Sequence, residues 1–273
     1  MNESQEIQGE QQPMFDENCP TCEGTGWERV IEDGFEKVKR CKCYYQARRK
    51  RLLLAARIPR RYSHCTLDRF IVSDVDYEEC SKGLSKGRGL DPYKNHVNIA
   101  GAKFGAENFI RKYRTTQQKE GIFFMGKCGV GKTHLAVAII RELIENGGVP
   151  CMFYDFRDLL KEIQASYNPQ SQISEYSVLE PVLTIEILLL DELGAAKVTD
   201  WMRDTLTYIL NTRYNENLTT IITSNWLDEK KDNNDEILEE RIGERLRSRL
   251  SEMCKVYEII GQDFRRKSGR AYS

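Results

Sequence analysis

The stretch from Gly121 to His134, with the sequence GIFFMGKCGVGKTH, constrains the fold of this chain more than any other segment. It begins with an apolar run, Ile122–Met125, that is typical of a buried strand, and a helical pattern follows over Leu135–Leu143. Between them, Gly126–Thr133 matches G-x-x-x-x-G-K-[ST] at every fixed position. The segment therefore predicts a strand, a phosphate-binding loop and a helix, and with them a site for a nucleoside triphosphate.

A loop of this kind binds phosphate because its glycines let backbone N–H groups point into one concavity. The N-terminus of the following helix adds partial positive charge. Lys132 is expected to reach the β- and γ-phosphates of ATP, and Thr133 to offer its hydroxyl to Mg²⁺. The residues expected to surround the nucleotide are Gly126, Lys127, Cys128, Gly129, Val130, Gly131, Lys132, Thr133 and His134.

A second apolar run, Ile185–Leu190, is interrupted only by Glu186 and ends in the pair Asp191-Glu192. Ligands of open parallel sheets sit at the carboxyl ends of the strands, so this pair is expected beside the phosphates. Asp191 would hold Mg²⁺ directly or through water, and Glu192 would polarise the water that attacks the γ-phosphate. The run therefore predicts hydrolysis of ATP as well as its binding.

Residues after two later strands extend the predicted site. A strand expected over Thr219–Thr223 leads to Asn225, which is placed to orient the attacking water. The segment Gly261–Arg266 follows the last strand and offers Arg265, which could bend back to the γ-phosphate of its own chain.

A charged helix expected over Glu236–Leu250 carries several arginines, of which Arg245 and Arg249 share one face. A guanidinium suits the charge of a transferring phosphoryl group because it is planar and always charged. An arginine of this helix is therefore expected to act on the ATP of a neighbouring subunit, whereas Arg247 is expected to be solvated.

Composition excludes several classes of protein. Hydrophobic residues make up 40% and charged residues 30% of the chain, as in globular proteins with a large core. No apolar run is long enough to predict a membrane span, and the polar N-terminus lacks the apolar core of a secretory signal. A cytoplasmic location is therefore expected, where the nine cysteines favour metal ligands or free thiols over disulfides.

Charge is unevenly distributed along the chain, although the net charge is −1. Residues 1–36 carry ten acidic side chains and one basic one, residues 38–61 carry ten basic and no acidic ones, and residues 241–273 carry nine basic and four acidic ones. Such runs are often solvated surfaces, but two basic regions in an otherwise acidic chain indicate a polyanionic partner.

Four cysteines near the N-terminus, the cysteine cluster, have the spacing of a metal site. They are Cys19, Cys22, Cys41 and Cys43. Two short strands expected over Trp27–Ile31 and Phe35–Val38, with a turn at Asp33-Gly34, would bring the two pairs together. Four thiolates leave no open position, so a structural Zn²⁺ site is expected, with unlinked reduced thiols as the alternative. The C-x-C spacing of the second pair departs from the commoner C-x₂-C.

Strands that alternate with helices predict an α/β fold, with a parallel sheet covered by helices on both faces. The expected divisions are a disordered tail (1–17), a zinc-binding module (18–45), a helical linker and lead-in (46–97) and an ATPase domain (98–273). Further strands are expected over Cys151–Tyr154 and Lys255–Ile260, helices over Tyr44–Arg57, Asn98–Lys112, Arg157–Ala165 and Asp200–Tyr214, and a loop over Ser166–Glu180.

In this order, the motifs resemble those of the AAA+ ATPases. GKCGVGKT looks like Walker A, ILLLDE like Walker B, TSN like sensor 1 and GERLRSRL like the arginine-finger box. GKCGVGKTHLA, LLLDELG, ITSN, RIGERLRSRL, GQDFR and the lead-in IPRRY are similar to the DnaC/IstB group of helicase loaders and transposition helper ATPases. The resemblance covers about Ile58 to Arg266. It implies that Arg249 is the arginine finger, that Arg265 is sensor 2 and that the helical lid of most AAA+ proteins is reduced or absent.

The resemblance also implies partners. CPTCEGTGW…CKC is similar to a zinc module that precedes the ATPase in some phage and primosomal loader-like proteins. In loaders the N-terminal region docks on a hexameric replicative DNA helicase, while the ATPase domain binds single-stranded DNA and self-associates with ATP. Two alternatives stay open: a transposition helper ATPase that acts on target DNA, and a nucleotide-gated adaptor with negligible turnover. Glu192 argues against the adaptor.

Overall fold

The computed structural model divides into two compact units, Met1–Ala55 and Ala56–Ser273. It describes residues 15–72, 94–116, 119–167, 174–195, 199–230 and 236–267. Most of the tail predicted to be disordered over residues 1–17 therefore lies outside the described residues. No helix in the described ranges is both long and apolar enough to span a membrane.

The N-terminal unit contains a hairpin followed by a helix. Strand β1 (Trp27–Glu32) pairs antiparallel with β2 (Phe35–Arg40), and helix α1 (Lys42–Ala55) follows. Asp33 and Gly34 form the turn with φ values of 55° and 80°, the left-handed conformations that a two-residue hairpin turn needs. The predicted hairpin and basic helix are confirmed. Both strands are mostly exposed, so the buried cysteine cluster, with Phe15 packed against it, supplies the core of this unit.

A parallel sheet of six strands organises the second unit. Its strand order is β3-β8-β4-β7-β6-β5, and every pairing is parallel. The predicted α/β fold is therefore confirmed, and β3 is a strand that the sequence did not predict. The strands are β3 (Lys94–Val97), β4 (Gly121–Gly126), β5 (Cys151–Asp155), β6 (Ile187–Asp191), β7 (Thr219–Ser224) and β8 (Cys254–Ile259).

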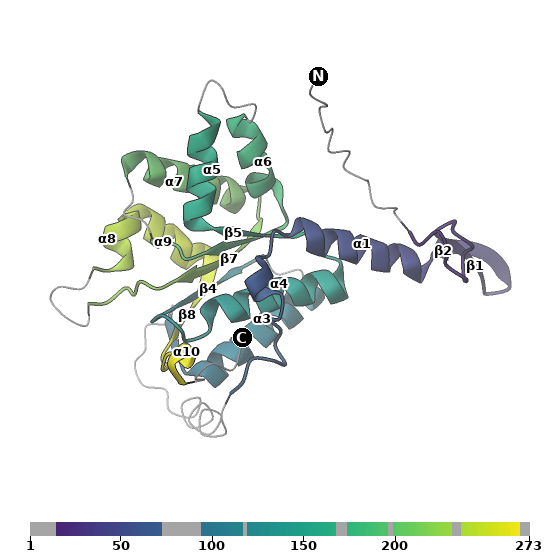
Figure 1. Ribbon diagram of the computed structural model, residues 1–273, viewed down its shortest axis with the longest axis horizontal. Coiled ribbons are helices and arrows are strands. Elements are labelled where there is room, and N and C mark those ends of the chain that lie inside the picture. The colour runs from purple at the N-terminus through teal and green to yellow at the C-terminus, as the bar shows by residue number, and fades with distance from the viewer. Residues whose placement is uncertain are drawn as a thin grey trace, which may run out of the picture. The chain divides into compact units, whose positions relative to one another are not determined.

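Helices cover both faces of this sheet, with α3 and α4 on one side and α5 to α9 on the other (Figure 1). A short 3₁₀ helix, η1, precedes them in the chain, and α10 follows the last strand. The bounds are η1 (Arg60–Tyr62), α3 (Ile99–Thr116), α4 (Lys132–Gly147), α5 (Phe156–Ser166), α6 (Glu175–Thr184), α7 (Asp200–Asn215), α8 (Leu238–Ile242), α9 (Glu244–Met253) and α10 (Phe264–Lys267).

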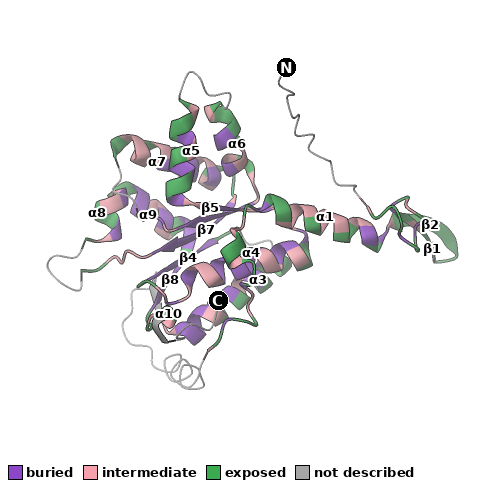
Figure 2. Cartoon of the chain, in the orientation of Figure 1, coloured by how far each residue is buried: buried purple, intermediate pink, exposed green. Residues whose placement is uncertain are grey.

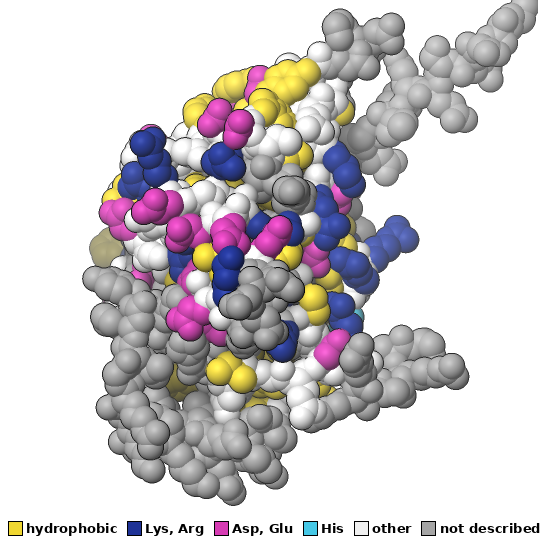
Figure 3. All heavy atoms as spheres, turned by 90° about the vertical axis from the view of Figure 1, so that its left-hand side faces the viewer, with side chains coloured by type: hydrophobic (Ala, Val, Ile, Leu, Met, Phe, Trp, Pro, Cys, Tyr) yellow, Lys and Arg dark blue, Asp and Glu magenta, His cyan; other side chains and the backbone are white. Residues whose placement is uncertain are grey.

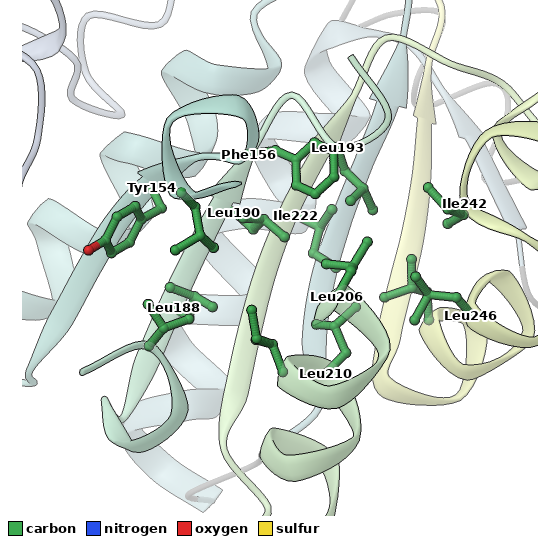
Figure 4. Packing of buried hydrophobic residues seen from close by; sticks show 14 of the residues in the cluster. Tyr154, Phe156, Leu188, Leu190, Leu193, Leu206, Leu210, Ile222, Ile242 and Leu246 are labelled. Atoms are coloured by element: carbon green, nitrogen blue, oxygen red, sulfur yellow. The ribbon is translucent and has the colours of Figure 1, made fainter. Parts of the chain in front are cut away.

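The core explains why the central strands β4 and β6 are almost entirely apolar. All residues of β4, β6 and β7 are buried, because helices pack on both sides of them (Figure 2). On the side of α5 to α9, Leu190 of β6 and Ile222 of β7 belong to the same cluster as Leu206 and Leu210 of α7 (Figure 4). Burying each such side chain contributes about 1.5–3 kcal/mol. The sheet is thus a rigid platform for the polar residues that follow its strands.

The predicted loop over Ser166–Glu180 is wrong in its last part, where helix α6 begins. Ser174 caps this helix by accepting a hydrogen bond from Ser177 N at 3.1 Å. Val178 and Val182 are buried on its inner face. Val178, Leu179, Val182 and Leu183 have helical spacing, but Pro181 inside the helix and the polar residues before it favoured a loop.

The single helix predicted over Glu236–Leu250 is also wrong, since two helices, α8 and α9, occupy this stretch. They meet at Gly243, whose φ of 91° and ψ of 148° lie outside the helical region and are open to glycine. The break changes the direction of the chain. It therefore also changes which arginine of α9 faces the core.

Arg213 is the largest fully buried side chain in the described part of the protein. Its guanidinium donates to Thr220 Oγ1 at 3.1 Å, to Val182 O and Ile185 O at 2.9 Å each, and to Thr219 O at 2.6 Å. Burial lowers its pKa to about 9. One side chain thereby joins the end of α6, the helix α7 and the start of β7.

Replacing Arg213 with Met is expected to lower the free energy of unfolding by about 3–5 kcal/mol, because it leaves several buried carbonyl oxygens without a donor. Urea unfolding followed by circular dichroism measures this change. Arg245→Met, at an exposed position of α9, is the matched control and is expected to change stability by less than about 0.5 kcal/mol. Similar losses in the two variants would contradict the structural role of Arg213.

Candidate nucleotide-binding site

The glycine-rich loop joins the end of β4 to the start of α4. Gly126, Gly129 and Gly131 have φ values of 149°, 81° and 95°. Gly131 caps α4, and a methyl group added there would lie 2.5 Å from Cε2 of Phe70. Both the backbone conformation and the neighbouring ring therefore require glycine at this position.

Lys132 begins α4 and is 5% exposed. Its Nζ donates to the carbonyl oxygens of Gly126 and Lys127, each at 2.8 Å, and its burial lowers its pKa to about 8. Val130 is fully buried beneath the loop, whereas Lys127 and Cys128 are exposed. The loop therefore closes on its own lysine, which a triphosphate would draw away from these carbonyls.

Asp191 ends β6 and is fully buried. Its Oδ1 accepts hydrogen bonds from Thr133 Oγ1 at 2.9 Å and from Thr223 Oγ1 at 2.5 Å, and Thr223 Oγ1 accepts one from Glu192 N at 3.0 Å. Burial raises the pKa of Asp191, while the two hydroxyl donors oppose that rise. The first turn of α4 and the ends of β6 and β7 thus meet at one carboxylate.

The surroundings of Asp191 fit a magnesium ion. Its Oδ2 is buried without a hydrogen-bond partner, which is unfavourable unless a cation or water takes the free lone pairs. The hydroxyl of Thr133 lies beside the same carboxylate. Carboxylate and hydroxyl oxygens are hard ligands of the kind that Mg²⁺ prefers. Asp191 and Thr133 would therefore hold the ion, which would neutralise phosphate charge.

Glu192 follows Asp191 and adopts a left-handed conformation with a φ of 57°. Its Oε2 accepts a hydrogen bond from Arg157 Nη2 at 2.8 Å, and both side chains are partly exposed. Arg157 lies in the first turn of α5, immediately beyond β5 at the same edge of the sheet. While this ion pair is formed, the carboxylate of Glu192 is engaged and a water molecule must compete for it.

Replacing Arg157 with Ala is expected to raise the basal rate of ATP hydrolysis about two- to fivefold, because a partly exposed ion pair of about 0.2–1 kcal/mol no longer holds Glu192. Steady-state phosphate release without DNA or protein partners measures the rate. Lys161→Ala on the same helix removes an exposed ion pair with Asp158 and serves as the control. An unchanged or lower rate in Arg157→Ala would show that the pair does not restrain Glu192.

Residues 58–72, called the lead-in segment from here on, lie beside the phosphate loop. His134 Nε2 lies 2.9 Å from Thr66 O, and the ring of Phe70 lies 5.3 Å from the imidazole of His134. Burial lowers the pKa of His134. The side chain of His134 therefore contacts the lead-in segment, while its backbone directly follows the phosphate loop.

Two further predicted residues lie near the loop. Asn225 follows β7 directly and is half-buried at the edge of the sheet that carries Asp191. Arg265 lies in α10, where Phe264 N donates to Gly129 O at 3.1 Å. The segment after β8 is thus bonded to the phosphate loop, and it leaves Arg265 exposed beside it.

Arg249 lies elsewhere. Its Nη1 is 3.3 Å from Glu252 Oε2, and its guanidinium is 4.3 Å from the ring of Tyr214. Helix α9 runs on into β8, whose first residue, Cys254, pairs with Gly121 at the start of β4. Arg249 therefore approaches the edge of the sheet opposite to its own phosphate loop.

The expectation that Arg247 is solvated is wrong. Arg247 is 7% exposed and forms two hydrogen bonds of 2.6 Å with the carboxylate of Asp228. The break at Gly243 orients α9 so that Arg247 faces inward beside Leu246 and Leu250, which are also buried. Arg245, by contrast, is exposed.

The cysteine cluster fits a tetrahedral metal site. Its four Sγ atoms lie within 4.8 Å of one another, with Cys19 to Cys41 at 3.8 Å and Cys22 to Cys43 at 3.5 Å. A Zn²⁺ ion with Zn–S bonds of about 2.3 Å separates its thiolates by about 3.8 Å. Gly26 N donates to Cys22 Sγ at 3.3 Å, a bond that favours the thiolate. Backbone hydrogen bonds lower the pKa of Cys19 to about 7, whereas burial raises the pKa of Cys43 to about 12.

Three residues around the site were not predicted from the sequence. Thr223 bridges Asp191 and Glu192, and its signal was available, since it is a hydroxyl residue at the end of a predicted strand. Arg157 could have been inferred from its place after β5, which ends at the same edge. Phe70 packs on Gly131 from a segment without periodicity, where no sequence signal indicates a contact.

Comparison with known proteins places this geometry in a family. A model of the IstB-like ATP binding protein family matches residues 108–271, more than half of the 273 residues. The chain belongs to this family. The match covers the phosphate loop, Asp191 and the arginines of α9 in one continuous region of this IstB-like protein.

Relatives of the IstB-like chain include named helicase loaders. The protein YqaM of Bacillus subtilis (strain 168) is 26% identical over 232 residues, 81% of this chain and 63% of YqaM. The replicative helicase loader DnaI of the same strain is 31% identical over 120 residues, 44% of this chain and 37% of DnaI. The crystal structure of the DnaC helicase loader matches with a TM-score of 0.57 and 27% identity, over 74% of this chain and 100% of that chain.

The IstB-like chain thus spans less than two thirds of the length of YqaM and of DnaI. The family and the structural match make its second unit an AAA+ ATPase domain of the IstB/DnaC type. Its relatives thus include both named helicase loaders and IstB-like ATP-binding proteins.

Proposed function

We propose that this protein is an ATP-dependent loader that places a hexameric replicative DNA helicase on single-stranded DNA in the bacterial cytoplasm. The observation that carries the proposal is an assembled phosphate and carboxylate site, around Lys132 and Asp191, in a chain whose relatives are named loaders. ATP and Mg²⁺ occupy this site, and Zn²⁺ is held by the cysteine cluster. Glu192 activates water, Asn225 orients it and Arg265 contacts the γ-phosphate in cis.

ATP binding joins the subunits in this proposal. Arg249 supports it because the residue lies near the sheet edge opposite to its own phosphate loop, so that it serves the ATP of a neighbouring subunit. Its side chain is 35% exposed, which leaves it accessible from outside. Hydrolysis removes the γ-phosphate that Arg249 contacts and thereby weakens the assembly.

Replacing Arg249 with Ala is expected to lower ATP turnover roughly tenfold or more and to abolish ATP-dependent self-association, because the neighbouring γ-phosphate loses its cation. Phosphate release and light scattering after size exclusion measure the two effects. Arg245→Ala, one helical turn away and also exposed, is the control. Unchanged turnover and assembly in Arg249→Ala, or the larger effect in Arg245→Ala, would refute the assignment.

Single-stranded DNA is the proposed nucleic-acid ligand. Exposed aromatic residues suit it because bases stack on their rings, at about 1–3 kcal/mol per base. Three tyrosines are exposed: Tyr167 at the end of α5, Tyr176 in the first turn of α6 and Tyr208 in the middle of α7. The face drawn in Figure 3 gathers hydrophobic side chains at its upper end, and Lys and Arg side chains lie below them among Asp and Glu side chains. These cations would contact the phosphate backbone and make binding salt-dependent.

The helicase contact is proposed for the N-terminal unit. Its hairpin exposes apolar side chains that the small core cannot cover, namely Trp27 at 44%, Ile31 at 80%, Phe35 at 72% and Val38 at 60% exposure. Exposed apolar residues on a metal-stabilised hairpin are typical of a protein-binding surface.

A transposition helper ATPase is the second candidate, because the matching family model is that of IstB-like proteins. Purification of the tagged full chain from its host, with ATP and Mg²⁺ present, separates the candidates. Recovery of a replicative helicase supports the loader, and recovery of a transposase refutes it. A variant with Glu192→Gln, which is expected to keep ATP bound, should increase the yield of the partner.

A further inference from the structure

Three side chains with metal-ligating atoms meet beside the first turn of α4, apart from the magnesium site and the cysteine cluster. They are His64, Cys65 and His134, whose ligand atoms all lie within 4.8 Å of one another. His64 and Cys65 follow η1 in the lead-in segment, while His134 comes from α4. The group therefore joins two segments that are about 70 residues apart in the sequence.

The three ligand atoms are spaced more widely than in a tetrahedral site, but within reach of one. The Sγ of Cys65 lies 4.0 Å from Nε2 of His64. A Zn²⁺ ion with Zn–S of about 2.3 Å and Zn–N of about 2.0 Å would separate these two atoms by about 3.5 Å. Side-chain rotations that move the ligand atoms by on the order of 1 Å would complete the set. His64 is exposed, and the centre of its imidazole lies 6.1 Å from that of His134.

A hydrogen bond to the backbone holds the imidazole of His134 in place. His134 Nε2 lies 2.9 Å from the carbonyl oxygen of Thr66, which can only accept, so Nε2 carries the proton and Nδ1 keeps its lone pair. Metal-ligating histidines commonly donate their other N–H to a backbone carbonyl in this way, because the bond fixes the ring. The ring of Phe70 packs against the same imidazole and restricts it further.

We propose that His64, Cys65 and His134 bind one Zn²⁺ ion, with water as the fourth ligand. One thiolate and two imidazoles form a donor set that zinc accepts, and three protein ligands leave a position open. When the Zn–S bond forms, the thiol proton of Cys65 passes to solvent, and no electron is transferred. The thiol is 2% exposed, and burial raises its pKa to about 11, so the metal rather than the solvent would favour its thiolate.

Binding would tie the lead-in segment to the phosphate-binding helix. His134 follows Thr133, whose hydroxyl bonds to Asp191, and Phe70 of the lead-in packs on Gly131. A metal that restrains residues 64–66 therefore restrains the wall of the nucleotide site. The proposed zinc site does not depend on whether the protein binds a helicase or single-stranded DNA.

Zinc content of the full-length protein tests the proposal. After dialysis against chelator-buffered Zn²⁺, the wild type is expected to hold two equivalents per chain, while Cys65→Ser and His64→Ala are each expected to hold one. Cys41→Ser removes the other equivalent, so failure of the cysteine cluster to bind zinc gives a different pattern. Cys151→Ser is the matched control, since it changes another buried thiol that lies outside the proposed ligand set.

Two measurements distinguish loss of a specific zinc site from loss of folding. His64→Ala changes an exposed side chain, so circular dichroism should stay that of the wild type while one zinc is lost. Co²⁺ added to Cys41→Ser should give a thiolate-to-cobalt absorption band that disappears in Cys41→Ser/Cys65→Ser. Equal zinc content in wild type, Cys65→Ser and His64→Ala, or an unchanged cobalt band, would overturn the proposal.

Discussion

Replacing Glu192 with Gln is expected to lower the rate of ATP hydrolysis by about 100- to 1,000-fold while ATP binding is retained. A general base contributes on the order of 10²- to 10⁴-fold to such a step, and an amide cannot take the proton of the attacking water. The contacts of Asp191, Thr133 and Lys132, which hold metal and phosphates, are untouched by the change. Single-turnover hydrolysis and equilibrium binding of ATP measure the two effects separately.

Glu180→Gln is a suitable control for this experiment, because Glu180 is an exposed carboxylate on α6 away from the sheet edge that carries the site. Measurements with DNA and partner present also address the adaptor alternative. If wild type and Glu192→Gln then hydrolyse ATP at equal rates, Glu192 is not the base and the protein acts as a nucleotide-gated adaptor.

Replacing Cys41 with Ser is expected to release the zinc of the cysteine cluster and to unfold the N-terminal unit. Cys41 is fully buried, and the hairpin of this unit is mostly exposed, so the core of the unit consists largely of the four cysteines. Structural zinc supplies about 10 kcal/mol or more of folding free energy in modules of this size. Zinc release to a colorimetric chelator and protease sensitivity of residues 15–55 measure the effect.

The second unit should be unaffected by this change, because its sheet and helices form a core of their own. Its thermal transition is expected at the temperature found in the wild type. Cys128→Ser, at an exposed thiol outside the cluster, controls for the substitution itself. Retention of zinc in Cys41→Ser, or protease resistance equal to that of the wild type, would refute a structural Cys₄ site.

Much of the fold was predictable because its signals are local. The buried strands β4 and β6 are continuous apolar runs, and glycines mark the loop that follows β4. Parallel pairing then brings the strand ends together, so Asp191 could be expected beside the loop. The hairpin turn could also be predicted, because Asp33-Gly34 is a pair of residue types that readily adopt the positive φ values of such a turn.

Most failures came from long-range packing. Helix α6 is a partly local failure, because Pro181 obscured a helical spacing that buries Val178 and Val182 against neighbouring helices. The sequence predicts Arg247 at the surface, but the break at Gly243 orients α9 so that Arg247 pairs with Asp228. Arg157 and Thr223 belong to the site only because the strand order places β5, β6 and β7 side by side.

The bonds of Lys132 to its own loop link nucleotide binding to proton uptake. In the closed loop, burial lowers the pKa of this lysine to about 8, so part of the population carries no charge in mildly alkaline solution. Bound phosphates favour the ammonium form and raise that pKa, so ATP captures a proton together with the side chain. The affinity for ATP should therefore decline as the pH rises above about 8, even though ATP itself stays fully ionised. The loop carbonyls that hold Lys132 until phosphate replaces them thereby make nucleotide binding dependent on pH.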